Sequence, residues 1–219
     1  MADVGVTVVT GATGLVGTAL TRALGARGEE VVALTREAAD VADAAAERWP
    51  EGIAVECVDT GRDTPTGGRV AALGERLDGE SFCVTYADGV ADVDLGAQLD
   101  FHHGHGALAT MTVVQPHLQW GVAEIAGDRI AGFVEKPRSE HWINGGFLCF
   151  EPGALAYIGS DSVLEREPLE ALAAAEQLRA FRHDGFWDCM DTYKDAVLLN
   201  DLWESGEPPW RVWAEEPAL

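Results

Sequence analysis

The chain has 219 residues, which is enough for one α/β domain with a well-buried core. Its formal net charge of −22 excludes the basic surface that nucleic acid or an anionic membrane would require. No apolar run is long enough to span a membrane and the N-terminus has no leader pattern, so we expect a cytoplasmic protein. The four cysteines form no closely spaced pair, which predicts free thiols in a reducing compartment.

The first third of the sequence alternates strand-like and helix-like segments. This alternation predicts βαβ units and hence a parallel sheet. The expected elements are strands at 4–10, 30–36 and 53–60, helices at 15–27 and 37–48, and a helix at about 70–76 after the polar loop 60–69.

The rest of the sequence adds antiparallel content. The expected elements are strands at 81–90, 107–116, 142–152 and 178–185, a β-hairpin at 121–137 that turns at Gly127-Asp128, and helices at 94–104, at 165–177 and from Tyr193 onward. The fold class is therefore α/β, and we expect residues 1–219 to form a single domain. Its sheet should be mixed but mostly parallel, with helices on its flanks.

Two aromatic groups call for an interpretation of their own. His102, His103 and His105 fall at the end of an expected helix, and we interpret them as a solvated helix end rather than a metal site. The tail tryptophans are expected to pack against the body or to form an oligomer contact; they are Trp203, Trp210 and Trp213.

The opening VTGATGLVGTAL (residues 9–20) places Gly11, Gly14 and Gly17 between an expected strand and an expected helix. Glycines at this spacing let the backbone approach a phosphate at the N-terminus of the helix. Together with EVVALTR, the opening (about residues 4–36) resembles the extended short-chain dehydrogenase/reductase family. Arg36 would then favour NADP over NAD.

That reductase resemblance implies a Tyr-xxx-Lys pair in which the lysine lowers the tyrosine pKa. The residues four positions after the three tyrosines are instead Val90, Asp161 and Val197. Binding of NADP without this proton-transfer pair therefore stays one open alternative.

A series of motifs follows from residue 53. In order they are VDTGRDTPTGGR, FCVTYADGV, LDFHHGHG, FVEKP, WINGGF, EREPLE, HDGFW and MDT. Their order and spacing over residues 53–213 resemble glucose-1-phosphate cytidylyltransferases of the nucleotide-diphospho-sugar pyrophosphorylase group. The resemblance implies a Rossmann-like nucleotide-diphospho-sugar transferase fold. It also implies transfer of CMP from CTP to glucose 1-phosphate, with release of pyrophosphate.

Such a transfer leaves the protein little covalent chemistry, so catalysis depends on positioning and on neutralising negative charge. It needs Mg²⁺ held by carboxylates, together with a few cations. By resemblance, Asp88 in YADGV and Asp191 in MDT ligate Mg²⁺, and Lys136 in EKP contacts the sugar phosphate. We therefore expect these three residues to form the catalytic site.

Further positions match the family's substrate contacts. The resemblance assigns the sugar to Glu135 and to the INGG motif, with a glutamate of EREPLE as an additional candidate; these residues are Glu135, Asn144, Gly145, Gly146 and Glu167. A nucleotide-wrapping loop would use Thr66, Gly67 and Gly68. The phosphate loop at the N-terminus would use Gly11, Gly14, Gly17 and Thr18.

The N-terminal opening departs from the cytidylyltransferase pattern. That family begins with a GGxGTRL loop and a Lys-Pro pair, whose arginine and lysine offset the charge of the leaving group. Here Ala19 follows Gly17-Thr18, and the chain has only two lysines, Lys136 and Lys194. The departure predicts weak or lost transfer. Three hypotheses therefore stay open: a homo-oligomeric transferase for a nucleotide and a sugar 1-phosphate, an NADP-binding protein, and a non-catalytic scaffold.

Overall fold

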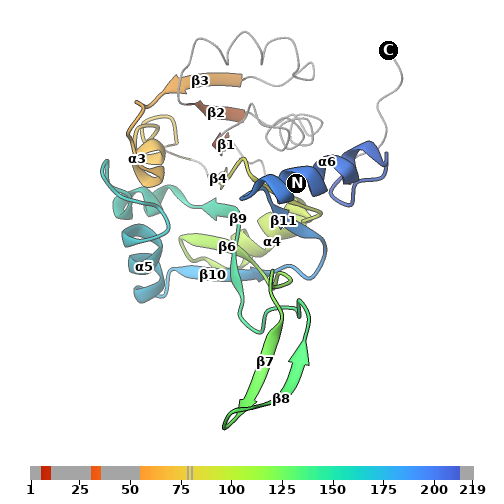
Figure 1. Cartoon of the computed structure of the whole chain (residues 1–219). Helices are drawn as coiled ribbons and strands as arrows, with labels where there is room; N and C mark the ends of the chain where they lie inside the picture. The colour runs from red at the N-terminus through yellow and green to blue at the C-terminus, as the bar shows by residue number, and fades with distance from the viewer. Residues whose placement is uncertain (1–5, 11–30, 36–54, 78, 80, 213–219) are drawn as a thin grey trace.

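The computed structural model describes residues 6–10, 31–35, 55–77, 79 and 81–212 (Figure 1). A seven-stranded sheet in the order β10-β6-β9-β4-β1-β2-β3 forms its centre. The strands are β1 Val6–Thr10, β2 Val31–Thr35, β3 Val55–Asp59, β4 Phe82–Thr85, β6 Ala109–Val114, β9 Ile143–Phe150 and β10 Leu178–Arg182.

The sheet is parallel except at one strand. β9 runs antiparallel to both β4 and β6, while the other pairs are parallel. The expected mixed, mostly parallel sheet is thus confirmed. The expected helices at 15–27 and 37–48 lie outside the described residues.

Helices cover both faces of the sheet, as Figure 1 shows. They are α3 Thr66–Ala71, α4 Leu95–His105, the 3₁₀ helix η1 Pro152–Tyr157, α5 Glu167–Ala174 and α6 Tyr193–Glu204. None of the described helices is long and apolar enough to cross a membrane.

Alternation along the strands decides which helix each face contacts. Phe82 of β4 and Phe150 of β9 stack with ring centroids 5.4 Å apart, in the core cluster that includes Val70 of α3 and Leu172 of α5. Their neighbours along the strands point to the opposite face, because successive side chains of a strand alternate. On that face Cys149 packs with Leu99 of α4.

Two small antiparallel pairs extend from this body. β5 (Gly89–Ala91) pairs with β11 (Trp187–Cys189) close to the end of β4. β7 (Val122–Ala126) and β8 (Arg129–Val134) form a hairpin that projects from the body in Figure 1. The hairpin turns at Gly127-Asp128, as the sequence predicts.

The helix expected at about 70–76 in fact begins earlier. α3 starts at Thr66, and a Cβ on Gly68 would lie 2.1 Å from the Ser160 carbonyl oxygen. A Cβ on Gly67 would lie 2.7 Å from the Ser162 carbonyl oxygen. These glycines therefore let a helix pack directly on segment 160–162. Reading them as part of a polar loop was wrong, because glycine here serves close packing as well as turning.

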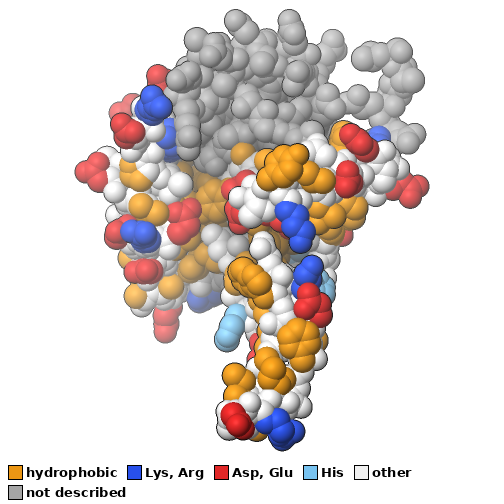
Figure 2. Space-filling model, in the orientation of Figure 1, with side chains coloured by type: hydrophobic (Ala, Val, Ile, Leu, Met, Phe, Trp, Pro, Cys, Tyr) orange, Lys and Arg blue, Asp and Glu red, His pale blue; other side chains and the backbone are white. Residues whose placement is uncertain are grey.

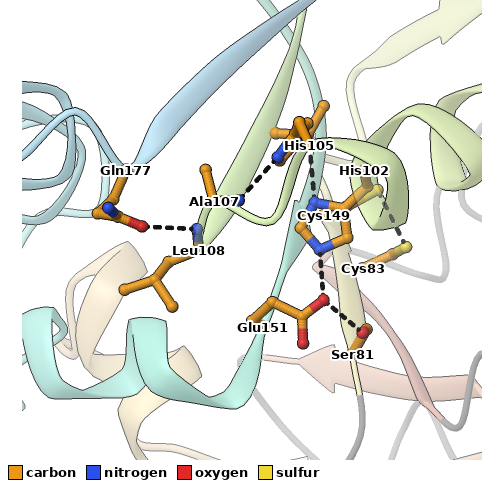
Figure 3. A network of polar contacts seen from close by, with 10 residues as sticks. Ser81, Cys83, His102, His105, Ala107, Leu108, Cys149, Glu151 and Gln177 are labelled. Atoms are coloured by element: carbon orange, nitrogen blue, oxygen red, sulfur yellow. Dashed lines mark hydrogen bonds and ion pairs between the residues drawn. The ribbon is translucent and has the colours of Figure 1, made fainter.

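The histidine cluster is also not the solvated helix end that we expected. His102 is only 1% exposed, and its Nδ1 lies 2.8 Å from Thr110 Oγ1 (Figure 3). His105 Nε2 lies 2.7 Å from the same hydroxyl, while His103 is exposed. The sequence interpretation failed because α4 turns its histidine face toward β6, where a threonine supplies hydrogen bonds.

The expectations for the cysteines and the tail tryptophans can also be compared with the structure. Cys83 and Cys149 form no disulfide, as expected; they are directly opposed partners of β4 and β9, and their sulfur atoms lie 3.5 Å apart. Trp210 is buried against Val90 and Leu199, so this tail tryptophan packs on the body as expected. Trp213 lies outside the described residues.

Candidate active site

A cavity of about 610 Å³ lies where the parallel strands end. Thr85 closes β4, and Ile143 opens the antiparallel β9 at the same edge; both residues line the cavity. Ligands of open α/β sheets bind at this edge, because the loops beyond the strand ends leave a crevice. The sheet thus places this cavity at the edge where a ligand would bind.

Six of the sequence-predicted site residues line this one cavity. They are Asp88, Lys136, Asn144, Gly145, Gly146 and Asp191. They come from four separate segments: the β4–β5 loop, the turn after β8, the start of β9 and the loop before α6. Only the folded sheet brings these segments together.

Backbone pairing holds the two predicted metal ligands beside each other. Gly89 of β5 pairs with Cys189 of β11, and the Met190 N–H donates to the Asp88 carbonyl oxygen at 2.7 Å. Asp88 therefore sits one residue before a pairing position, and Asp191 follows two residues after the opposing one. Both carboxylates line the same cavity as a result.

The loop that carries Lys136 has an unusual backbone. Lys136 has a φ of +47°, in the left-handed region that non-glycine residues seldom adopt. Its carbonyl oxygen accepts a hydrogen bond from His117 Nδ1 at 3.1 Å, and the Pro137 carbonyl oxygen accepts one from the Leu118 N–H at 2.9 Å. These two hydrogen bonds hold the turn in its strained conformation. Strained residues are often found at functional sites, which is a reason to examine Lys136 for function.

The INGG motif forms one wall of the cavity. Asn144 Oδ1 accepts a hydrogen bond from the Gly146 N–H at 2.9 Å. Gly146 has a φ of +81°, and a Cβ there would lie 2.8 Å from Cδ2 of the Tyr86 ring. Glycine is therefore needed at 146 for its backbone conformation and to make room for the ring of Tyr86.

Several lining residues were not found from the sequence. Tyr86 donates its hydroxyl proton to Glu165, and burial, followed by this carboxylate, raises the pKa of Tyr86 well above its ordinary value. Trp187 Nε1 donates to the Gly145 carbonyl oxygen at 2.8 Å. Lys194, the second lysine of the chain, also lines the cavity. The scarcity of lysine was the one sequence signal that could have found it.

Other predicted residues lie away from the cavity lining. Thr66 Oγ1 donates to Glu165 Oε2 at 2.8 Å and accepts from the Leu164 N–H at 2.9 Å, so it holds the loop before α5. Glu167 accepts a long hydrogen bond of 3.4 Å from the Val163 N–H. Glu135 is exposed after β8. With Gly67 and Gly68 packed on segment 160–162, the substrate roles of these positions stay predictions.

The residues of the predicted N-terminal phosphate loop lie outside the described residues. They are Gly11, Gly14, Gly17 and Thr18. Arg36, on which the NADP alternative depended, lies outside them as well.

The cavity suits a hard divalent cation better than a soft one. Asp88 and Asp191 offer oxygen ligands, and Mg²⁺ needs only one or two carboxylates besides water and substrate phosphates. Within the described part of the chain, no three or more His, Cys, Asp or Glu side chains are arranged so that they alone could hold a metal ion. Burial raises the pKa of the Cys189 thiol to about 12, so this group stays protonated and donates to Asp191 Oδ2 at 3.3 Å.

Comparison with known proteins now identifies the family. A sequence model described as "Nucleotidyl transferase" matches residues 6–202. The chain belongs to the nucleotidyl transferase family. The match begins in β1 and runs into α6, so it covers both the glycine-rich opening and the residues that line the cavity.

Relatives within the family differ in nucleotide and sugar. Glucose-1-phosphate cytidylyltransferase from Salmonella typhimurium is 44% identical over 162 residues, which are 73% of this chain and 63% of that protein. Mannose-1-phosphate guanylyltransferase 1 from Arabidopsis thaliana is 31% identical over 145 residues, or 62% of this chain and 40% of that protein. The chain therefore spans less than two thirds of the length of these relatives.

Solved structures agree on the fold. A UTP-bound UGPase from Acinetobacter baumannii has a TM-score of 0.65 and 15% identity, covering 95% of this chain and 96% of that one. A UDP-glucose pyrophosphorylase complexed with UDP-glucose has a TM-score of 0.67 and 12% identity, covering 93% and 100%. The expected nucleotidyltransferase fold is thus confirmed.

The resemblance of the opening to reductases finds no support in these comparisons. The nucleotidyl transferase match already includes residues 6–36. A strand, a glycine-rich turn and a helix open both kinds of fold, because each must bring backbone amides to a phosphate. Three spaced glycines therefore could not distinguish the two families.

Proposed function

We propose that this chain transfers CMP from CTP to glucose 1-phosphate and releases pyrophosphate. The observation that carries the proposal is the convergence of Asp88, Lys136, Asn144 and Asp191 on one cavity at the carboxyl edge of the sheet. The identity to glucose-1-phosphate cytidylyltransferase supports the same reaction. The nucleotide and the sugar are part of the proposal, because relatives of the family use more than one of each.

In the proposed reaction, an oxygen of the sugar phosphate attacks the α-phosphorus of CTP. The bond from that phosphorus to the bridging oxygen breaks, and pyrophosphate leaves from the opposite side. Asp88 and Asp191 would hold Mg²⁺, which when bound neutralises charge on the phosphate oxygens. Lys136 would hold the sugar phosphate for in-line attack, so the contribution of the protein is orientation and charge.

The INGG wall supports recognition of a polyhydroxylated substrate. Asn144 Oδ1 accepts from the Gly146 N–H, and its amide NH₂ also hydrogen-bonds the Tyr86 hydroxyl, which leaves one of its two N–H groups to donate to a ligand. Trp187 occupies one lone pair of the Gly145 carbonyl oxygen, and the second lone pair stays available to accept. A donor and an acceptor on one wall can pair with the hydroxyls of a hexose, and unmatched sugars would leave them unpaired.

A pyrophosphate-release assay across the four ribonucleoside triphosphates and several hexose 1-phosphates tests this proposal. We expect release only when a nucleotide and a sugar 1-phosphate are both present with Mg²⁺, with CTP and glucose 1-phosphate as the preferred pair. Binding of CTP without any release would support the non-catalytic scaffold instead. The proposal would be overturned if the chain neither bound these substrates nor released pyrophosphate.

We also propose that the chain forms a homo-oligomer through the β7–β8 hairpin. Ile125, Ile130 and Phe133 are 76%, 63% and 63% exposed, and Figure 2 shows apolar side chains along the projecting hairpin. A contiguous apolar surface of this kind marks an interaction site in soluble proteins. We expect light scattering to give a multiple of the chain mass, and Ile125→Glu with Ile130→Glu to reduce it to one chain. Glu124→Gln on the same hairpin should leave the mass unchanged, and a monomeric wild type would overturn this proposal.

A further inference from the structure

The second lysine of the chain reaches the candidate active site on the first turn of α6. Lys194, Asp195 and Leu198 line the cavity, and this spacing places them on one side of a helix. Leu199 is buried against Val90 and Trp210 on another side. This packing fixes the rotation of α6, so the direction of Lys194 toward the cavity is set by the fold.

The carboxylates nearest to Lys194 in the sequence are occupied. Asp195 Oδ2 accepts hydrogen bonds from both the N–H and the hydroxyl of Thr192, each at 2.8 Å, in the capping box of α6. Asp191 accepts a bond from the Cys189 thiol. Within the part of the chain that the structure describes, Lys194 forms no salt bridge. Its ammonium group is therefore available to a ligand.

The charge of the cavity calls for such a cation. Four aspartates line it, namely Asp88, Asp188, Asp191 and Asp195, whereas its lysines are Lys136 and Lys194 alone. A phosphate group enters a site of this kind only where local cations outweigh the carboxylates. The N-terminus of α6 adds partial positive charge beside Lys194, because its first backbone N–H groups point out of the helix.

We propose that Lys194 is a phosphate-binding residue of this cavity, acting together with Lys136. The inference rests on the proposed function, since it assigns the ammonium group to a phosphate of one substrate. It also supplies a cation that the N-terminal opening lacks, where Ala19 follows Gly17-Thr18. In this chain α6 provides positive charge at the side of the cavity that carries Asp191.

The phosphate can come from CTP or from glucose 1-phosphate, and direct binding separates the two. Isothermal titration of the full chain with Mg²⁺ would compare CTP, glucose 1-phosphate and inorganic pyrophosphate for wild type, Lys194→Met and Lys194→Arg. We expect Lys194→Met to weaken at least one ligand by about tenfold or more, as for loss of a charged hydrogen bond. Lys194→Arg should keep most of the affinity, because it keeps the charge.

Matched controls exclude a loss of structure. Arg129→Met removes a cation from the tip of the hairpin and should change no affinity. Lys194→Met should melt at the wild-type temperature, because the Lys194 side chain is exposed and has no ion-pair partner among the described residues. A weakening for CTP and pyrophosphate alone assigns Lys194 to the nucleotide, and a weakening for glucose 1-phosphate alone assigns it to the sugar phosphate.

The failures of the two proposals can be distinguished. If the wild type binds these ligands and Lys194→Met binds each of the three as tightly as the wild type does, the assignment of Lys194 is wrong and the proposed function stands. If wild type binds none of the three, both proposals are overturned.

Discussion

The two ends of the same three strands carry polar groups of opposite character. At one end β4, β6 and β9 lead into the cavity, with Asp88, Asn144 and Lys194 around open space. At the other end Ser81, Thr110 and Glu151 join a closed network with two histidines of α4 (Figure 3). Polar side chains at the first end line a cavity, while those at the second end contact mainly one another.

The closed network has a defined direction of hydrogen bonding. His105 Nδ1 accepts from the Ala107 N–H at 2.9 Å, so a neutral His105 carries its proton on Nε2 and donates it to Thr110 Oγ1. His102 Nε2 lies 3.3 Å from Glu151 Oε1, and because a carboxylate oxygen can only accept, the proton of a neutral His102 belongs on Nε2 and its Nδ1 accepts from the Thr110 hydroxyl. Ser81 donates to the same carboxylate oxygen at 3.0 Å.

This comparison separates groups that stabilise the fold from groups that we propose bind a substrate. A buried polar group contributes to stability only when it is paired, because an unpaired one loses its hydration without compensation. An open, unpaired group at a strand end contributes little to stability and is free to bind. Changes at the cavity should therefore alter activity, and changes at the network should alter the free energy of unfolding.

The largest expected effect is at the cavity end. Asp88→Asn removes one carboxylate of the proposed Mg²⁺ site, and we expect pyrophosphate release to fall on the order of 10³-fold, as for loss of a strong electrostatic contact in a transition state. The melting temperature should stay within about 2 °C of wild type, since substitutions outside the core change stability little. Asp184→Asn, at an exposed carboxylate, is the matched control and should keep full activity. An Asp88→Asn variant with wild-type activity would contradict the assignment of catalysis to the cavity end of the strands.

The next effect is the pH dependence of stability at the network end. Burial lowers the pKa of His102 from its ordinary 6.5 to about 4, so the unfolded chain binds its proton first as the pH falls. Stability from the neutral imidazole is complete above pH 6.5 and is lost between about pH 6.5 and 4, by up to about 3 kcal/mol. Urea unfolding at several pH values measures this loss.

Two histidine variants make the pH measurement specific. His102→Gln removes the titrating group and should flatten the dependence between pH 6.5 and 4. His103→Gln replaces an exposed histidine of the same helix and should leave the wild-type slope. Equal slopes in all three proteins would mean that His102 does not control acid stability.

A pair of glycine variants compares the two ends directly. Gly146→Ala combines a φ of +81° with a contact on the Tyr86 ring, so we expect a loss of about 2 kcal/mol in stability, together with reduced activity. Gly106 follows the last residue of α4 with a φ of +68°, and a Cβ added there would meet open space. Gly106→Ala should therefore lower the free energy of unfolding by about 1 kcal/mol and leave activity unchanged. Thermal unfolding and the pyrophosphate assay on both variants test the difference.

The smallest effect distinguishes two buried threonines of β6. Thr110→Val leaves two histidine nitrogens without the shared hydroxyl, and we expect a loss of about 1 kcal/mol. The Thr112 hydroxyl is buried with no hydrogen-bond partner among the described residues, so Thr112→Val should be neutral or stabilising. Urea midpoints that fall equally for both variants would contradict the role of the network.

The sequence alone predicted much of the sheet and much of the cavity, for reasons that can be traced to particular elements. β4 and residues 147–150 of β9 are apolar runs next to turn residues, and such runs indicate buried strands without long-range information. Asp88 and Asn144 stand at the ends of those runs, where an α/β sheet positions its ligands. At these positions the predicted strands and the candidate site residues agree with the structure.

Other features depended on contacts that no local pattern contains. Gly67 and Gly68 pack on a segment almost a hundred residues later, and Thr110 reaches His102 across two elements. Tyr86 becomes a lining residue because Glu165 and Gly146 accommodate it, and neither lies near it in the sequence. The resemblance of the glycine-rich opening to reductases found no support for a related reason, since three spaced glycines are a local pattern that two families share.

The central position of β9 has a consequence for how the chain reaches this structure. β4 and β6 are made first, but they cannot pair with each other, because β9 belongs between them. Their inner edges stay open until Phe150 has been synthesised and β9 inserts. Contacts of such long sequence separation form slowly, and open strand edges invite association with other chains. On the ribosome, the two halves of the sheet would therefore join only late in synthesis, and the wall that carries Asn144 would form in the same step.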